Sequence, residues 1–171
     1  LSLHDALPIF EEGLITGDDL KTVPTSSPGR VDFGALIPWK NALLVKAAEA
    51  FPKQATSHER LAFDVFREKE ALWLGDYALF MALKQAHNGA VWTAWGSELA
   101  SREPHAIAHA RKRFAEPIYA LEFAQYLFFK QWRHIQREAR NRGITIIGDI
   151  PIYVAHDSAD VWANSGLFEL D

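Results

Sequence analysis

One acidic side chain near the C-terminal end of the sequence stands at a place where proteins often do chemistry. Asp149 follows the β-branched run "ITIIG" and precedes Pro151. The run is almost continuously apolar, which predicts a strand from Ile144 to Asp149 that is buried on both faces, as in a parallel sheet or barrel. Functional side chains gather at the C-terminal ends of such strands, because the following loop opens there. Asp149 is therefore a candidate active-site carboxylate, although its position fits a loop-capping role equally well.

Two groups of histidines also have the spacing of chemical sites. His105 and His109 lie four residues apart on an expected helix, and two ligands of one zinc ion can use this spacing. Their surroundings "HAIAHARKR" are basic and offer no third ligand, so a solvated helix face is the better interpretation. His156 beside Asp157 suggests an acid–base pair, but neighbours in an extended segment rarely face each other. We expect no metal site and no cofactor site.

Tryptophan rings are a third group, because their flat faces can stack on sugar rings. We expect most of them to be core residues. Trp132 fits the buried stripe of a long helix, whereas Trp92 and Trp95, in a short glycine-bounded segment, are the best candidates for an exposed pair. The tryptophans considered are Trp73, Trp92, Trp95, Trp132 and Trp162.

Composition narrows the function classes. The chain has 171 residues, of which 49% are hydrophobic, so one domain with a sizeable core is expected. A net charge of −4 argues against a general nucleic-acid or membrane-surface binder. The absence of cysteine excludes disulfides and thiolate metal sites and fits the reducing cytoplasm.

Helical periodicity predicts most of the elements that must position these residues. Residues 10–34 are rich in Gly, Pro, Ser and Asp and are expected to be loop with at most one short turn. Pro38 fits a first helical turn, Pro52 is expected to end that helix, and Ser57 is expected to cap the next. Helices are predicted over 36–51, 60–68, 70–87, 97–101, from Pro104 and over 116–142. Leu72 is expected on the buried side of the helix 70–87.

The long helix 116–142 carries one apolar stripe at helical spacing. Its predicted members are Leu121, Ala124, Phe128, Trp132, Ile135 and Ala139. A lone parallel strand after it cannot pair with itself, so its backbone groups need a partner. Either the chain is all-helical with an unusual tail, or it is a piece of a larger α/β protein, which we favour.

Several long motifs resemble those of the 4-α-glucanotransferases of glycoside hydrolase family 77. The most specific is "IIGDIPIYVAHDSADVWAN", and "RVDFGALIPWKNALL", "FREKEALWLGDYALFMALKQAHNGAVWTAW" and "QYLFFKQWRHIQREARNRGI" lie upstream of it. The resemblance covers essentially residues 10–171. One departure is Ser165-Gly166, where the family usually has Pro-Glu.

The resemblance implies a fragment of an α/β fold, the (β/α)8 TIM barrel. Residues 10–115 would form a helical subdomain inserted before barrel strand 3, and residues 116–171 the long barrel helix, strand 3 and the following loop. The neighbouring strands would lie in sequence missing on both sides. Residues 1–9, "LSLHDALPI", resemble a translated sequencing adapter, and we set them aside; the alternative is an ordinary frayed N-terminus.

The resemblance also implies a function. Asp149 would be a supporting active-site carboxylate, and Tyr153, Asp157 and Ser158 further substrate contacts. The nucleophile and the acid/base would lie beyond Asp171, so the fragment itself would be inactive. The complete enzyme would transfer α-1,4-glucan segments between maltooligosaccharides by a retaining double displacement, without a cofactor, a nucleic-acid partner or a membrane.

Two alternatives stay open at this point. The chain could be a stand-alone helical module that binds glucans or another partner. It could also be a piece of an α-amylase-type hydrolase. Members of that group typically have Asn-His where this chain has Tyr153-Val154, which favours the transferase family.

Overall fold

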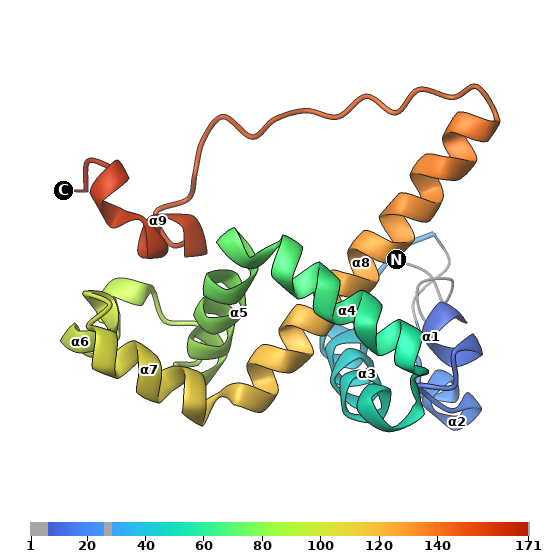
Figure 1. The fold of residues 1–171 in the computed structure, drawn as a ribbon, viewed down its shortest axis with the longest axis horizontal. Coiled ribbons are helices and arrows are strands. Elements are labelled where there is room, and N and C mark those ends of the chain that lie inside the picture. The colour runs from blue at the N-terminus through green and yellow to red at the C-terminus, as the bar shows by residue number, and fades with distance from the viewer. Residues whose placement is uncertain (1–6, 26–28, 171) are drawn as a thin grey trace. The chain divides into compact units, whose positions relative to one another are not determined.

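The computed structural model describes residues 7–25 and 29–170. Helices and connecting segments make up this part of the chain, and no strand is found within it (Figure 1). The chain forms two compact units, Leu1–Val65 and Phe66–Asp171. None of the described helices has the length and apolar character needed to cross a membrane.

The first unit contains α1 (Leu7–Glu11), α2 (Gly17–Lys21), α3 (Phe33–Gln54) and the start of α4 (Ser57–Lys69). The expectation of a loop over 10–34 was therefore wrong for α2 and for the end of α1. A capping box explains α2, which is too short for a periodic signal. Thr16 Oγ1 accepts a hydrogen bond from the Asp19 amide, and the Thr16 amide donates to Asp19 Oδ2 at 2.7 Å.

Both prolines of α3 lie inside the helix rather than at its ends. Asp32 is the N-cap and accepts a hydrogen bond from the Ala35 amide, which moves the start upstream of the expected residue 36. Pro52 does not end the helix, because Phe51 is buried against Phe63, with ring centroids 5.8 Å apart. These apolar contacts outweigh the bias that a proline puts on the preceding residue.

The next helix, α4, begins with a second capping box. Thr56, not the predicted Ser57, makes the capping contacts: its amide donates to Glu59 Oε2 at 2.8 Å and its hydroxyl accepts from the Glu59 amide. Residues 1–6 lie outside the described residues, and Ile9 in α1 is buried. The interpretation of residues 1–9 as adapter-derived stays a prediction.

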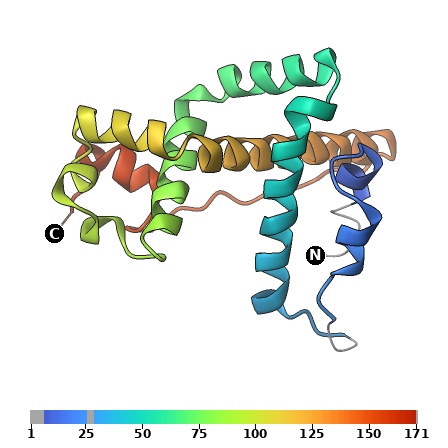
Figure 2. The ribbon, with the colours of Figure 1, turned by 90° about the horizontal axis from the view of Figure 1, so that it is seen from below.

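The second unit is built on two long helices. α5 (Ala71–Ala86) packs against α8 (Ala115–Asn141), which Figure 2 shows as one unbroken helix. Asn88 and Gly89 end α5 in the left-handed conformation, with φ angles of 53° and 79°, as their sequence predicts. The shorter elements are η2 (Trp92–Ala94), α6 (Ser97–Ala100), α7 (Pro104–Arg113), α9 (Ala159–Ala163) and η3 (Ser165–Leu167).

The predicted helices of this unit are present, but the buried faces differ from those expected. Leu72 is 98% exposed, and Phe128 and Ile135 of the predicted stripe are about half exposed. The side of α8 that is buried follows a neighbouring stripe instead, because that side meets α5. Both stripes have helical spacing, so periodicity alone could not choose between them. The buried residues are Ile118, Glu122, Phe123, Tyr126 and Leu127.

The segment 144–155, between α8 and α9, forms neither helix nor strand and runs as a long stretched connection (Figure 1). The predicted strand from Ile144 to Asp149 is therefore not formed by the described residues. A strand needs a neighbouring strand to take up its amide and carbonyl groups, and this segment has none. The described part of the chain is helical rather than α/β.

Candidate functional site

Asp149 lies in the stretched segment and is exposed. Its Oδ1 accepts a hydrogen bond from the adjacent Ile150 amide at 2.8 Å. Oδ2 has no partner in the described part of the chain, so it can accept hydrogen bonds from a ligand. Tyr153, four residues on, is 88% exposed. These two predicted site residues are accessible, but nothing in the described part of the chain brings them against a second reactive group.

The other two predicted site residues have structural partners. The Asp157 carboxylate accepts a hydrogen bond from the Lys84 ammonium group of α5 through Oδ2. Ser158 is the N-cap of α9, and its hydroxyl accepts from the Val161 amide at 3.3 Å. Both side chains therefore help to hold α9 in place.

His156 and Asp157 do not form the acid–base pair that their adjacency suggested. The His156 ring stacks on Trp92, with centroids 5.4 Å apart, and its carbonyl accepts a hydrogen bond from the Trp92 indole N–H at 2.8 Å. Asp157 faces Lys84 instead. Both residues lie in the bend that leads from the stretched segment into α9, and each side chain meets a different element of the helical part. No sequence signal pointed to Lys84 or Trp92 as these partners.

Helix α9 is fixed by its own tryptophan. Trp162 is fully buried and donates from its indole N–H to the Leu99 carbonyl at 3.0 Å. The Arg102 guanidinium lies 4.2 Å from the centre of the same indole ring, and it also donates to Asp76 at 3.0 Å. A stacked and hydrogen-bonded indole of this kind is a strong anchor for a five-residue helix.

Trp92 and Trp95 are not an exposed pair, contrary to expectation. They are 7% and 4% exposed and belong to the core of the second unit. Trp95 stacks on His87 and donates to the Ala90 carbonyl. The turn after α5 folds the segment back onto this core, and a three-residue 3-10 helix gives no periodicity from which burial could be predicted.

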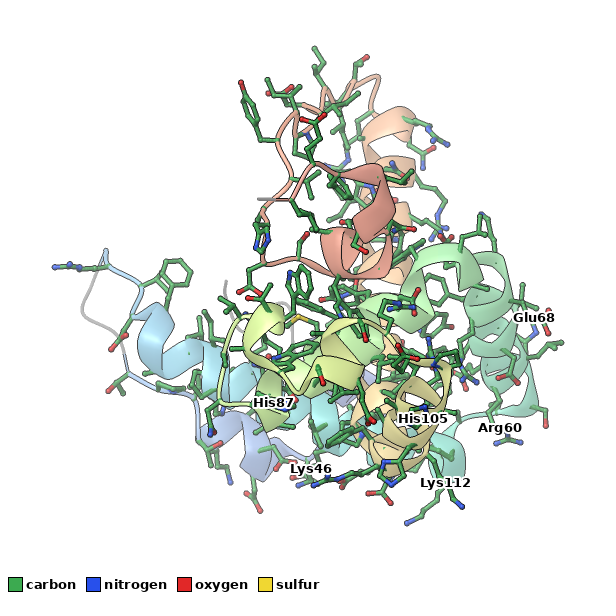
Figure 3. All side chains as sticks on the ribbon, turned by 90° about the vertical axis from the view of Figure 1, so that its left-hand side faces the viewer. Lys46, Arg60, Glu68, His87, His105 and Lys112 are labelled. Carbon is green, nitrogen blue, oxygen red and sulfur yellow. The ribbon has the colours of Figure 1, made fainter. Side chains whose placement is uncertain are left out.

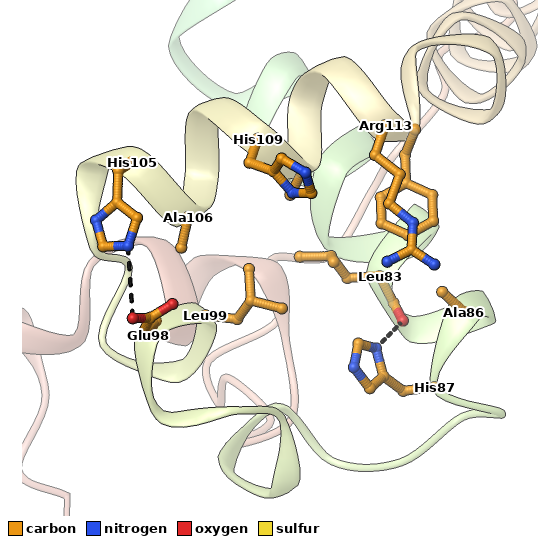
Figure 4. Close-up of a pocket in the computed structure, with 11 residues that line it drawn as sticks. Leu83, Ala86, His87, Glu98, Leu99, His105, Ala106, His109 and Arg113 are labelled. Carbon is orange, nitrogen blue, oxygen red and sulfur yellow. Dashed lines mark hydrogen bonds and ion pairs between the residues drawn. The ribbon is translucent and has the colours of Figure 1, made fainter.

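A hollow of about 330 Å³ lies between α5, α6 and α7, and His105 and His109 line it (Figure 4). His105 lies 3.5 Å from the Glu98 carboxylate, and the two side chains are 70% and 66% exposed. No cluster of three or more metal-binding side chains is found in the described part of the chain. The hollow also contains none of the predicted site residues, so it does not mark the candidate site.

Two side chains elsewhere in the chain have shifted pKa values. Hydrogen bonds from Lys46 and then Thr16 lower the pKa of Asp19 from 3.8 to about 2. Burial raises the pKa of Tyr77 above its ordinary value. Both residues lie on helices, away in sequence from the segment 144–155.

Comparison with known proteins identifies the family. A family profile described as 4-alpha-glucanotransferase, glycoside hydrolase family 77, matches residues 3–171, a range that begins within the stretch 1–9 that we set aside. A 4-alpha-glucanotransferase from Thermus thermophilus is 47% identical over 169 residues, which are 99% of this chain and 33% of the relative. A Synechocystis 4-alpha-glucanotransferase is 42% identical over 163 residues, which are 95% of this chain and 32% of the relative.

A solved structure agrees with these relatives. The amylomaltase from Streptococcus agalactiae in complex with acarbose has a TM-score of 0.87 and 34% identity, over 95% of this chain and 33% of that one. The chain thus spans about a third of the length of the curated relatives it matches. Since the family profile matches nearly every residue, this chain belongs to the 4-alpha-glucanotransferase family, glycoside hydrolase family 77.

Proposed function

We propose that this chain is part of a 4-alpha-glucanotransferase that transfers α-1,4-glucan segments between maltooligosaccharides. The observation that carries the proposal is the 47% identity over 169 residues to the Thermus thermophilus 4-alpha-glucanotransferase. The similar amylomaltase that binds acarbose supports a sugar ligand. The family match also favours this activity over that of an α-amylase-type hydrolase.

Within a (β/α)8 barrel, Ile144–Asp149 would be strand 3 and residues 10–115 the helical insertion before it. Two observations support this placement. The backbone of the segment 144–155 belongs to no ladder in this structure, and Ile147 is 91% exposed. Neighbouring strands would take up those backbone groups and cover that side chain.

The proposed reaction is a retaining double displacement through a covalent glucosyl-enzyme, which an acceptor sugar rather than water then resolves. Asp149 would hold sugar hydroxyls and help to stabilise the oxocarbenium-like transition state. Tyr153 would be a further substrate contact, and Asp157 and Ser158 would act by holding the loop. The nucleophile and the acid/base would be supplied by sequence outside this chain, and the complete enzyme would work in the cytoplasm without a cofactor.

The first test uses a chimera in which this chain replaces the matching third of the Thermus thermophilus relative. With maltotriose, the chimera should release glucose and form longer maltodextrins. Asp149→Asn should lower its turnover by about 100-fold, the usual scale for losing one transition-state electrostatic contact. Asp160→Asn, at an exposed acid of α9, is the matched control and should leave turnover unchanged. Unchanged turnover in Asp149→Asn would remove Asp149 from the active site.

The second test uses the 171-residue chain alone. It should produce no glucose from maltotriose, because the residues proposed for the chemistry are not among its own. Glucose together with longer maltodextrins would refute this inactivity. Binding of amylose by the inactive chain in a gel-shift assay would support the alternative of a helical glucan-binding module.

A further inference from the structure

We propose that Lys84 and Trp92 are positioning residues that lock the register of the segment 144–155, and with it the direction in which Asp149 and Tyr153 point. This inference rests on the proposed function. It concerns two residues of the helical part that are far in sequence from the segment. Neither of them would touch the substrate.

The N-terminal end of the segment is fixed by the end of α8. Gly143 has a φ of 69°, and its amide donates to the Arg140 carbonyl at 3.0 Å. The Ile144 amide donates to the Ala139 carbonyl at 2.8 Å. These two bonds close the helix with a left-handed glycine, so the first residue of the segment has one defined position.

The C-terminal end is fixed by two contacts from the helical part. Lys84 pairs with Asp157, and the two side chains are 20% and 31% exposed. Trp92 donates to the His156 carbonyl at 2.8 Å and stacks on the His156 ring. Lys84 also donates to the Ala90 carbonyl at 3.2 Å, which joins the end of α5 to the turn that carries Trp92.

The half-buried Asp157 carboxylate makes Lys84 important. Its Oδ1 is buried and has no hydrogen-bond partner, while Oδ2 accepts from Lys84. Without the ammonium group, neither oxygen would have a partner in the described structure. A half-buried carboxylate in that state is strongly unfavourable, so the segment would leave its position.

Fixed ends matter because the segment cannot set its own register. Side chains alternate along an extended chain, so Asp149 and Tyr153 share one side and Ile150 and Ile152 the other. A slip by one residue would turn every side chain to the opposite side. Apolar residues lie on both sides, because Ile147 is on the side of Asp149 and Ile152 is on the other. These two side chains are 91% and 82% exposed. The hydrophobic pattern therefore does not select a register.

The first experiment measures turnover in the chimera described above. Lys84→Met should lower kcat at least tenfold with little change in KM, because the substrate contacts remain while the carboxylate at 149 is misplaced. Lys84→Arg should restore most of kcat, because a guanidinium can also pair with Asp157. Lys112→Met is the matched control, since Lys112 is an exposed lysine on α7 that points into solvent (Figure 3).

A kcat for Lys84→Met within twofold of the parent chimera would overturn the inference, while the proposed function would stand. An inactive parent chimera would instead refute the proposed function. In that case a second experiment, on the 171-residue chain, tests whether Lys84 and Trp92 hold the end of the segment.

That experiment measures hydrogen exchange in the 171-residue chain. The Trp162 amide, which donates to the Ser158 carbonyl at 3.1 Å, should exchange at least tenfold faster in Lys84→Met. Trp92→Phe keeps an aromatic ring but removes the N–H donor, and it should show the same direction. Lys112→Met should not change the exchange. Unchanged exchange in both anchor variants would overturn the register lock even if they fold normally.

Discussion

Helix α5 and the segment 144–155 are both apolar, yet the first is buried and the second is bare. Leu74, Leu79 and Leu83 of α5 are at most 1% exposed. Ile150 and Ile152 of the segment are 79% and 82% exposed. A helix satisfies its backbone within itself and needs a neighbour only for one face, whereas a strand needs a partner for every backbone group.

The second unit is stabilised mainly by its helices. The buried cluster joins α5, η2, α7, α8 and α9 through apolar and aromatic contacts, and the segment 144–155 contributes no member to it. In this chain the segment therefore behaves as a connection with two fixed ends. Its apolar side chains should count for stability only when strands from elsewhere cover them.

The largest loss of stability should follow from removing Trp162, the buried tryptophan that holds α9. Trp162→Ala deletes a fully buried indole with its hydrogen bond to Leu99 and its contact with Arg102. We expect the free energy of unfolding to fall by about 3–5 kcal/mol. Ile152→Ala, in the bare segment, should change it by less than about 0.5 kcal/mol. Urea unfolding followed by circular dichroism measures both, and equal losses would break the comparison.

A smaller loss of stability should follow from removing the partner of Glu122, the buried acidic residue of α8. Glu122 is 7% exposed, and Arg67 donates to its Oε2 at 2.7 Å. Arg67→Met should cost about 1–3 kcal/mol, because it leaves a buried carboxylate without this donor. Arg142→Met is the control, since Arg142 is 72% exposed and lies 3.5 Å from Glu138.

The double variant Arg67→Met with Glu122→Leu should recover much of the loss, because no buried charge then remains. The same urea titrations measure it. A single variant as stable as the parent would mean that the core of this unit tolerates an unpaired acid.

The same contrast explains what the sequence could predict. The helices 70–87 and 116–142 were predicted closely because their signals are local. Their apolar residues recur at helical spacing, and Asn88-Gly89 and Gly143 end them in the left-handed conformation. Long motifs identified the family, which the comparisons confirm. The burial of Trp92 and the exposure of Ile135 were not predictable, because each depends on which surface a distant element meets.

The candidate site shows the same division. Asp149 was singled out by its position after an apolar run and before Pro151, and the structure shows it exposed together with every other residue of the segment 144–155. Its role in the active site stays a prediction. The pairing of Asp157 with Lys84 spans 73 residues and left no trace in the sequence pattern. The strand predicted from Ile144 to Asp149 did not form, because the described part of the chain offers no second strand to pair with its backbone groups.

A charge placed in the segment should leave stability almost unchanged and alter self-association. Ile147→Lys should shift the free energy of unfolding by less than about 0.5 kcal/mol, because Ile147 is 91% exposed. It should also lower aggregation, since a lysine discourages edge-to-edge pairing of extended segments. Light scattering at increasing concentration measures the second effect.

Hydrogen exchange sharpens this result. The amides of Ile146 and Ile147 should exchange nearly as fast as in an unfolded chain, while the Leu79 amide in α5 should be strongly protected. Strong protection at Ile146 would show that the segment already has strand partners in solution.

The smallest effect concerns α2, a five-residue helix that a capping box and an exposed salt bridge from α3 hold. In α2, the pKa of Asp19 is lowered to about 2 by Lys46, which lies 2.6 Å away, and by Thr16. Because the folded pKa lies below the ordinary 3.8, this contribution is complete above pH 3.8 and is lost as the pH falls through about 2. Lys46→Met should therefore raise the Asp19 pKa toward 3.8 in an NMR titration, with only a slight loss of stability because the site is exposed. Lys53→Met, at an exposed lysine of α3, should leave the titration unchanged. An Asp19 pKa that stays near 2 without Lys46 would mean that the hydrogen bonds from Thr16 alone stabilise the ionised carboxylate.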